Sequence, residues 1–385
     1  MASLIRLPAA RTADLGKSGR RGGTMLGVSG RCRWALRLAW SNLALLGLMA
    51  ACAAPPTISP GLEPEPQARV WPAPPEPSRY AFAGFLVGER NFFDESASDS
   101  DAFTSAFRWL VGLTSSQQAF KELQRPIGGM VDDLGRVLVA DASRKAVLVF
   151  DIPNKRFLEW RAATEKTGFE SPVAIASDGG SGFYVTDSEA AEVYHLNSDG
   201  EPIGKFGRGV LTRPTGIARD PQTGTIYVAD TVQNNIRLFG NDGTPRDTLG
   251  SRGKDPGQFN APTHLTFSDS RLFVTDTLNF RIQVFDRTGD GHLTFGRLGL
   301  YVGDLTRPKG VAVARDGRIY VVESYYDHLL VFDPDGQFLL PIGGTGQGIG
   351  EFYLPAGVWT DNLGRVYVAD MFNGRVAVFK ELTSL

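Results

Sequence analysis

Six acidic residues recur along the C-terminal two thirds of the chain, and each closes a short apolar run such as "IYVAD". Their spacings are 46, 43, 46, 47 and 47 residues, and the six are Asp141, Asp187, Asp230, Asp276, Glu323 and Asp370. A period of this length is typical of repeat folds, in which every copy builds the same unit and packs on its neighbours. The recurrence also favours a structural role for the acids, because a reaction needs a catalytic carboxylate only once or twice.

Each copy contains four short strand-like runs separated by turns. A copy opens with a Pro, usually followed two residues later by Gly, as in "RPTGIAR". The acid-closing run comes next, then a third run such as "NIRLF" and a fourth after an Asp/Gly turn. Helical solenoids need amphipathic runs of ten or more residues, and the copies have none. We therefore predict an all-β protein, a six-bladed β-propeller of four-stranded antiparallel blades over residues 119–385.

The repeats resemble those of the NHL family, in which Pro-x-Gly, a Tyr-Val-Ala-Asp run and an Arg-Ile-x-Val-Phe run follow one another. The segments "RPTGIARDPQTGTIYVADTVQNNIRLF" and "APTHLTFSDSRLFVTDTLNFRIQVFD" carry the resemblance most clearly, and the six copies cover about 70% of the chain. The resemblance implies a propeller. It does not imply a ligand, because the family includes binding platforms, interaction domains and a few enzymes.

The last copy stops after its third strand, so one strand is missing from the ring. The run "RYAFAGFLVGER" at 79–90 is predicted to supply that strand and to hide an open sheet edge. Between this strand and the first blade, "AFTSAFRWLVGL" places apolar residues on one helical face. Residues 79–118 are therefore predicted to be a closing strand followed by a short helical insertion.

The N-terminal segment predicts export. Basic residues precede the apolar run "LALLGLMAA", which suits a signal peptide and ends at Cys52. The "LMAAC" stretch resembles a bacterial lipoprotein signal. This predicts that residues 1–51 are removed, with Met25 as an alternative start, and that Cys52 is lipidated. Residues 52–78 are rich in Pro and are predicted to be an extended tether. By the same resemblance, we expect an outer-membrane protein facing the periplasm or the surface.

Charge and cysteine content exclude some functions. Segment 1–51 holds eight basic residues and one acidic residue, which leaves 32 basic against 41 acidic residues in the remainder, a net charge of −9. Phosphate backbones should repel such a chain, so nucleic acid is not a predicted partner. The sequence contains two cysteines, Cys32 and Cys52, and the first lies in the segment that export would remove. Hence no disulfide and no cysteine-based metal site is expected.

The repeated positions have physical explanations. The Pro suits the first residue of the innermost strand, where a missing N–H costs no hydrogen bond. The Gly two residues later lies where the inner strands crowd the axis. The acid is expected to accept backbone N–H bonds from its loop. His264 replaces this Gly in the fourth copy, where bulk and a titratable ring cost packing unless they are used.

Ligand binding is predicted on the face that the Pro loops and the loops after the acids share. The candidate residues are His264, Arg125, Arg213, Arg307, Tyr325, Tyr326 and Arg375. Arginine and aromatic side chains suit an acidic or carbohydrate-like ligand or another envelope protein. We predict a binding or scaffolding module with no assigned catalytic residue and no cofactor. The alternative is a metal-assisted lyase or hydrolase that uses His264 at the channel mouth with zinc or calcium.

Overall fold

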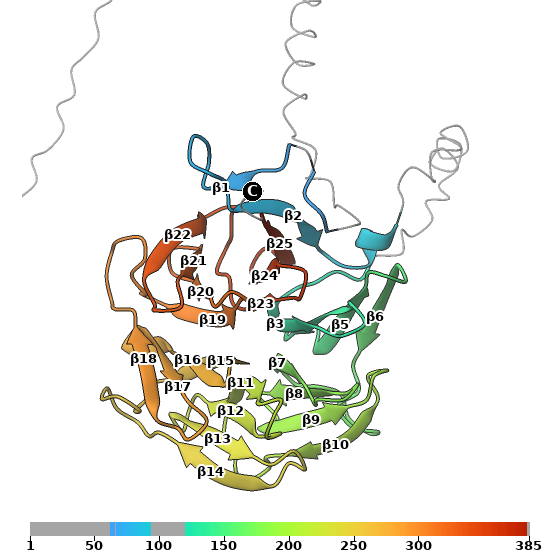
Figure 1. Ribbon diagram of the computed structural model, residues 1–385. Coiled ribbons are helices and arrows are strands. Elements are labelled where there is room, and N and C mark those ends of the chain that lie inside the picture. Colours follow the sequence, from blue (N-terminus) through green and yellow to red (C-terminus); the bar gives the residue numbers. More distant parts are fainter. Residues whose placement is uncertain (1–61, 66, 94–119, 383–385) are drawn as a thin grey trace, which may run out of the picture. The chain divides into compact units, whose positions relative to one another are not determined.

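The computed structural model of the protein describes residues 62–65, 67–93 and 120–382. The predicted signal peptide, Cys52, residues 52–61 and 66 of the predicted tether, and the predicted helix at 102–113 lie outside the described residues. The strands form six antiparallel sheets that surround a common centre (Figure 1). This is the six-bladed propeller that the repeat predicts.

The blades follow one another along the chain, and the first strand of each lies innermost. Blade 1 contains β3 (Pro126–Val131), β4 (Val137–Asp141), β5 (Ala146–Asp151) and β6 (Arg156–Trp160). Blade 2 contains β7 (Pro172–Ser177), β8 (Phe183–Asp187), β9 (Glu192–Leu196) and β10 (Pro202–Phe206). Blade 3 contains β11 (Pro214–Arg219), β12 (Ile226–Asp230), β13 (Asn235–Phe239) and β14 (Pro245–Leu249).

Blades 4 and 5 keep this order, and blade 6 is assembled from both ends of the chain. Blade 4 contains β15 (Pro262–Ser268), β16 (Arg271–Asp276), β17 (Arg281–Phe285) and β18 (Gly291–Phe295). Blade 5 contains β19 (Pro308–Val313), β20 (Ile319–Glu323), β21 (His328–Phe332) and β22 (Phe338–Gly343). Blade 6 contains β23 (Val358–Thr360), β24 (Arg365–Asp370), β25 (Arg375–Glu381), β2 (Tyr80–Leu86) and β1 (Val70–Trp71).

The N-terminal strand β2 closes the ring, as the sequence predicts. It pairs antiparallel with β25 from Tyr80 opposite Glu381 to Leu86 opposite Val376. The Tyr80 hydroxyl lies 3.1 Å from the Tyr320 hydroxyl of blade 5, so the closing strand is also bonded to a neighbouring blade. This arrangement leaves blade 6 with the outer strand that its own repeat lacks.

The structure corrects the end of the predicted tether. Residues 52–78 were expected to be a spacer, but β1 lies within that range and pairs with the outer edge of β2. Leu62 is 1% exposed and packs with Leu86, and Trp71 packs against Phe379 at a ring separation of 5.3 Å. Apolar side chains among the prolines therefore fix this segment to blade 6, and Pro content alone did not reveal it.

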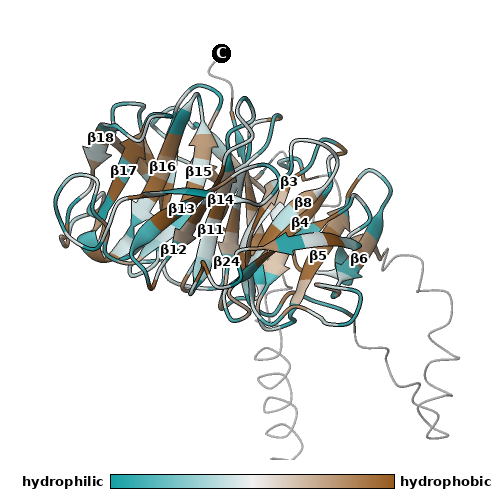
Figure 2. Ribbon diagram, turned by 90° about the horizontal axis from the view of Figure 1, so that it is seen from below, coloured by the Kyte–Doolittle hydropathy of each residue, from teal (hydrophilic) through white to brown (hydrophobic). Residues whose placement is uncertain are grey.

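The core lies between neighbouring blades. Alternate residues of each strand contact the sheet on either side, so the middle strands are buried on both faces and contain long apolar runs. Figure 2 shows the apolar residues concentrated in the strands, whereas the connecting loops are mainly hydrophilic. The loops are therefore where the blades differ in chemistry. The described residues contain two short 3-10 helices, η2 (Glu89–Phe92) and η4 (Thr277–Asn279), and no helix able to cross a membrane.

Candidate functional site

The six repeated acids fasten two loops together in each blade. Asp230 is fully buried, and its carboxylate accepts N–H bonds from Thr212 and Arg213 in the loop before β11, at 2.6 and 3.2 Å. The same carboxylate accepts N–H bonds from Val232 and Gln233 in the loop after β12, at 3.2 and 3.0 Å. This is the structural role that the recurrence predicts, and it reaches further than the turn cap expected from the sequence.

Glu323 performs this role in blade 5 with a longer side chain. It accepts N–H bonds from Arg307 at 2.5 Å and from Tyr326 at 2.8 Å. The replacement of Asp by Glu therefore retains the link between the Pro loop and the loop after the acid. It places Arg307 and the Tyr325 loop around one buried carboxylate.

The two sets of loops form one face of the propeller, which we call the Pro-loop face. A backbone hydrogen bond joins the loop after the acid to the loop before the inner strand in all six blades. The donors are Ala142, Ser188, Thr231, Leu278, Ser324 and Phe372. The predicted grouping of these loops on one face is therefore what the structure shows.

Three predicted arginines lie on this face in alternate blades. Arg125, Arg213 and Arg307 directly precede the inner strands β3, β11 and β19 of blades 1, 3 and 5, and all three are exposed. Arg213 forms an exposed ion pair with Glu189 at 3.3 Å. The side chains of Arg125 and Arg307 form no hydrogen bond or ion pair within the described part of the chain. Two cations on this face are thus available to a ligand.

Arg375 is not available, which corrects its assignment to the ligand-binding set. It is 8% exposed, and its Nε donates to Asp370 at 2.8 Å. Its other nitrogens donate to backbone carbonyls of the 347–351 segment, and its guanidinium lies 3.9 Å from the ring centre of Phe85. Arg375 is therefore a structural residue that holds blade 6 together, and sequence position alone placed it wrongly in a loop.

The two tyrosines after Glu323 also differ from each other. Tyr325 is 60% exposed, whereas Tyr326 is half-buried, and their rings meet edge to face at 4.9 Å. Tyr353 and Phe372 form a second edge-to-face pair on the same face and are 47% and 58% exposed. Tyr325 is therefore accessible to a ligand, whereas Tyr326 offers it less surface.

His264 lies recessed at the inner strands. The residue is partly exposed, but both ring nitrogens are buried and have no hydrogen-bond partner among the described residues. Burial, and next the positive charge of Lys309, lower the pKa of His264 to about 3. The imidazole is therefore neutral at physiological pH, with one N–H donor and one acceptor unused.

Lys309 also belongs to this site, although it was not among the residues predicted from the sequence. It follows Pro308 as the second residue of β19, is only partly exposed, and makes no hydrogen bond or ion pair within the described residues. Burial, and next the charge of Arg307, lower the pKa of the Lys309 amine to about 8. A sequence signal existed, because the residue after the Pro is uncharged in the other five copies: Ile127, Val173, Thr215, Thr263 and Ala356.

The surroundings of His264 do not form a metal site. No group of three His, Cys, Asp or Glu side chains gathers anywhere in the described ranges. His195 lies on β9, where its Nε2 is 2.9 Å from Asp178. His292 and His328 belong to β18 and β21, away from the inner strands. The charged neighbour of His264 is a cation, so the residues present suit an anion better than a metal ion.

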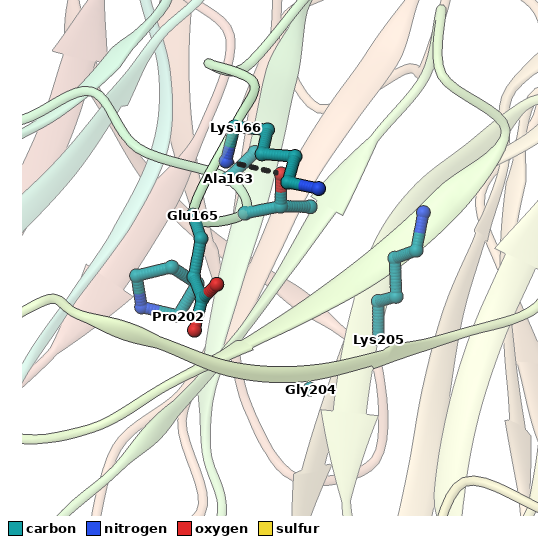
Figure 3. Close-up of a pocket in the computed structure, with 7 residues that line it drawn as sticks. Ala163, Glu165, Lys166, Pro202, Gly204 and Lys205 are labelled. Carbon is teal, nitrogen blue, oxygen red and sulfur yellow. Dashed lines mark hydrogen bonds between the residues drawn. The ribbon is translucent and has the colours of Figure 1, made fainter.

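A cavity lies at the outer edge of blade 2, beside the loop from β6 to β7. It is shallow, has a volume of about 300 Å³, and has Glu165, Lys166 and Lys205 among its lining residues (Figure 3). The Lys205 amine is already paired with Glu192 at 3.0 Å, and Glu165 adds a negative charge. This cavity therefore suits an anion less well than the inner part of the Pro-loop face does.

Comparisons with known proteins agree with this architecture. A family described as six-bladed beta-propeller matches residues 305–384. Peptidyl-glycine alpha-amidating monooxygenase A of Xenopus laevis is 30% identical in an alignment of 181 residues that covers 41% of this chain and 19% of that protein. The human E3 ubiquitin-protein ligase NHLRC1 is 30% identical over 112 residues, which are 29% of this chain and 28% of that protein. Both relatives carry NHL repeats. The chain is a six-bladed propeller with NHL-type repeats.

The similarity covers less than a third of the length of either relative. Among solved structures, streptogramin B lyase aligns with a TM-score of 0.51 and 15% identity, over 68% of this chain and 94% of that chain. Similarity at this level supports the fold alone. The function of this propeller therefore depends on its own side chains.

Proposed function

We propose that this propeller is a non-catalytic binding module that takes an acidic, carbohydrate-like ligand on its Pro-loop face. The observation that carries the proposal is the placement of Arg125, Arg213 and Arg307 before the inner strands of alternate blades, all exposed on one face. Planar guanidinium groups match carboxylates in shape and hydrogen bonding. Arginines spaced around a centre favour a ligand with several acidic groups.

Exposed aromatic side chains on the same face support the saccharide character of the ligand. Tyr325, Tyr353 and Phe372 present large apolar surfaces beside the loops that carry the arginines. Flat aromatic faces pack well against the apolar faces of sugar rings and lose little conformational entropy. An acidic saccharide would use both the cations and the aromatic rings. Another envelope protein with an acidic surface is the alternative partner that the experiment below separates.

We further infer that the propeller is exported and lipid-anchored through Cys52, at an outer membrane. The basic residues, the apolar run and the small residues before Cys52 support this inference. Replacing Cys52 by Ala should move the full chain from the membrane fraction to the soluble fraction after cell lysis. Retention of the C52A variant in the membrane fraction would count against lipidation.

Binding can be tested with the full chain and defined saccharides. We expect oligogalacturonate to bind in a salt-sensitive manner, and neutral malto-oligosaccharide of the same length to bind far less. The triple variant R125A/R213A/R307A should lose most of this binding. A control triple at Lys155, Arg246 and Arg315, three exposed cations outside the Pro-loop face, should retain it.

Two outcomes would refute the proposal. If both triple variants lose the same amount of oligogalacturonate binding, binding depends on the overall charge of the protein and not on the Pro-loop face. If oligogalacturonate does not bind but an acidic envelope protein is crosslinked to the face in the membrane, the ligand class is wrong.

A further inference from the structure

Blades 4 and 5 depart from the repeat at three neighbouring positions. His264 replaces the inner-strand Gly, Lys309 is the charged residue after the Pro, and Glu323 replaces Asp. The strands β15 and β19 that carry His264 and Lys309 are adjacent in the inner ring. Glu323 accepts the backbone N–H of Arg307, two residues before Lys309. Three separate departures therefore meet at one boundary between blades.

The equivalent glycines show where the His264 side chain goes. A Cβ on Gly128 would lie 2.7 Å from the Val173 carbonyl of the next blade, and a Cβ on Gly310 would lie 2.5 Å from the Val358 amide. At this position the Cβ thus points to the next inner strand, at the second to fourth residues counted from the Pro of that repeat. For His264 those residues are Lys309, Gly310 and Val311, and Gly310 has no side chain to obstruct the ring.

The two side chains have polar atoms without partners. Both nitrogens of His264 are buried and unbonded. The amine of Lys309, which is partly exposed, forms no hydrogen bond or ion pair within the described residues. Buried donors and acceptors in proteins are nearly always satisfied, and an unsatisfied group lowers stability. Unsatisfied imidazole nitrogens beside an unpaired cation on the adjacent strand therefore favour completion by a group from outside the protein chain.

The charges define what that group is. The Lys309 amine, with a pKa of about 8, is mainly protonated at neutral pH, and Arg307 adds a second positive charge nearby. His264 is neutral and can donate one N–H. An ammonium and an imidazole N–H suit the two oxygens of a carboxylate, whereas a metal cation would be repelled.

We propose that Lys309 binds one carboxylate group of a uronic-acid saccharide, with Arg307 at the entrance and with a rotation of the His264 ring that brings its N–H to the same carboxylate. This inference rests on the proposed binding function and specifies the subsite that anchors the ligand. The Tyr325 loop is joined to this subsite, because the Ser324 amide donates to the Arg307 carbonyl at 3.1 Å. Tyr325 thereby lies on the loop beside the cations, where it can pack against the sugar ring.

Calorimetric titration with trigalacturonate tests the subsite. Lys309→Met should weaken binding by about tenfold or more, since a charge-assisted hydrogen bond is lost. The matched control is Lys254→Met, which removes an exposed, unpaired cation from the loop before β15 on the same face. K254M should change the affinity by less than about twofold, because exposed charges contribute little. Equal effects of K309M and K254M would overturn the inference.

A labelling experiment tests the subsite independently of the ligand class. Pyridoxal 5′-phosphate is an anionic aldehyde whose carbonyl condenses with a neutral amine and releases water, and borohydride then reduces the imine to a stable secondary amine. A lysine with a lowered pKa in a cationic pocket should react first. Peptide mapping should therefore find Lys309 modified at least about fivefold faster than Lys254.

The two experiments separate the possible failures. If the R125A/R213A/R307A variant loses trigalacturonate binding but K309M does not, the proposed function stands and this subsite is wrong. If trigalacturonate does not bind and Lys309 is labelled first, the saccharide assignment is wrong but the anion subsite stands. Labelling of Lys309 no faster than Lys254 would overturn the subsite.

Discussion

Two boundaries between blades differ in the residues at equivalent repeat positions. One lies between blades 1 and 2, and the other lies between blades 4 and 5. At the first, Gly128 abuts the main chain of β7, and apolar Val173 follows the Pro. At the second, His264 and Lys309 occupy these two positions and leave polar atoms unbonded. The first boundary is filled and satisfied. The second retains unsatisfied groups that reduce stability, which is typical of positions kept for binding.

This difference separates the positions of the repeat that hold the fold from the positions that can bind a ligand. Where copies agree, as at Asp141 and Asp230, buried carboxylates bind backbone amides and hold the loops of each blade. Where one copy instead places a titratable group near the axis, that group lowers stability and forms no bond that holds the fold together. Exceptions to the repeat are therefore more informative about function than its conserved pattern.

The largest expected effect comes from opening the ring on which both boundaries depend. Deleting residues 79–90 removes β2, which pairs with β25 from Val376 to Glu381. We expect cooperative folding to be lost, or the melting temperature to fall by more than about 10 °C, because a central strand of blade 6 becomes an edge. Differential scanning calorimetry measures this effect, and an unchanged melting temperature would contradict the role of β2 in closure.

A side chain at the filled boundary should be strongly destabilising. In Gly128→Val, the new Cβ would lie 2.7 Å from the Val173 carbonyl oxygen, so the inner strands must move apart. We expect a loss of about 3 kcal/mol in the free energy of unfolding, measured by urea denaturation. His264→Gly at the same repeat position should cost far less. Equal losses would show that the two boundaries do not differ.

The buried histidine should make the protein sensitive to acid. The pKa of His264 is lowered from 6.5 to about 3, so the unfolded chain takes up the proton first as the pH falls. Wild-type stability should therefore decline from pH 6.5 towards pH 3, and His264→Gly should flatten this decline by ~1–3 kcal/mol. Urea denaturation across this range measures it, with His292→Ala on the exposed strand β18 as the control. Identical pH profiles of wild type and H264G would contradict the burial of the ring.

Lys309→Met should stabilise the protein slightly in the absence of ligand. Because the folded-state pKa of Lys309 is about 8 and the ordinary value is 10.5, the charged amine disfavours the folded state fully below pH 8. Removing it should raise the free energy of unfolding by ~1–2 kcal/mol at pH 7. The advantage should shrink between pH 8 and 10.5, where wild-type folding releases a proton. A loss of stability at pH 7 would show that Lys309 serves the fold rather than a ligand.

Much of the fold was predictable from the sequence, for reasons that particular residues illustrate. Asp230, Gly216 and Pro214 are fixed by backbone needs that recur in every blade, so repetition revealed the strands and the closure. Trp71 was missed because a lone apolar residue among prolines gives no periodic signal, although it packs in the core.

The site was predictable only in part. His264 was found because it breaks a repeated Gly. Lys309 was missed although it is the one charged residue after the Pro among the six copies, because its burial depends on the ring geometry. Arg375 was assigned wrongly, because the sequence shows that it follows an acid but not that its guanidinium turns back to bind Asp370. Whether a cation faces a ligand or a neighbouring carboxylate is settled by tertiary structure.

The most direct test of the account is the pKa of the Lys309 amine, measured by NMR titration of the full chain with isotopically methylated lysines. We expect titration near pH 8 in the free protein, caused by burial and by Arg307. We also expect an upward shift of this pKa when trigalacturonate is added, because a bound carboxylate stabilises the ammonium. Titration near 10.5 with and without the saccharide would contradict a recessed, unpaired amine that waits for a carboxylate.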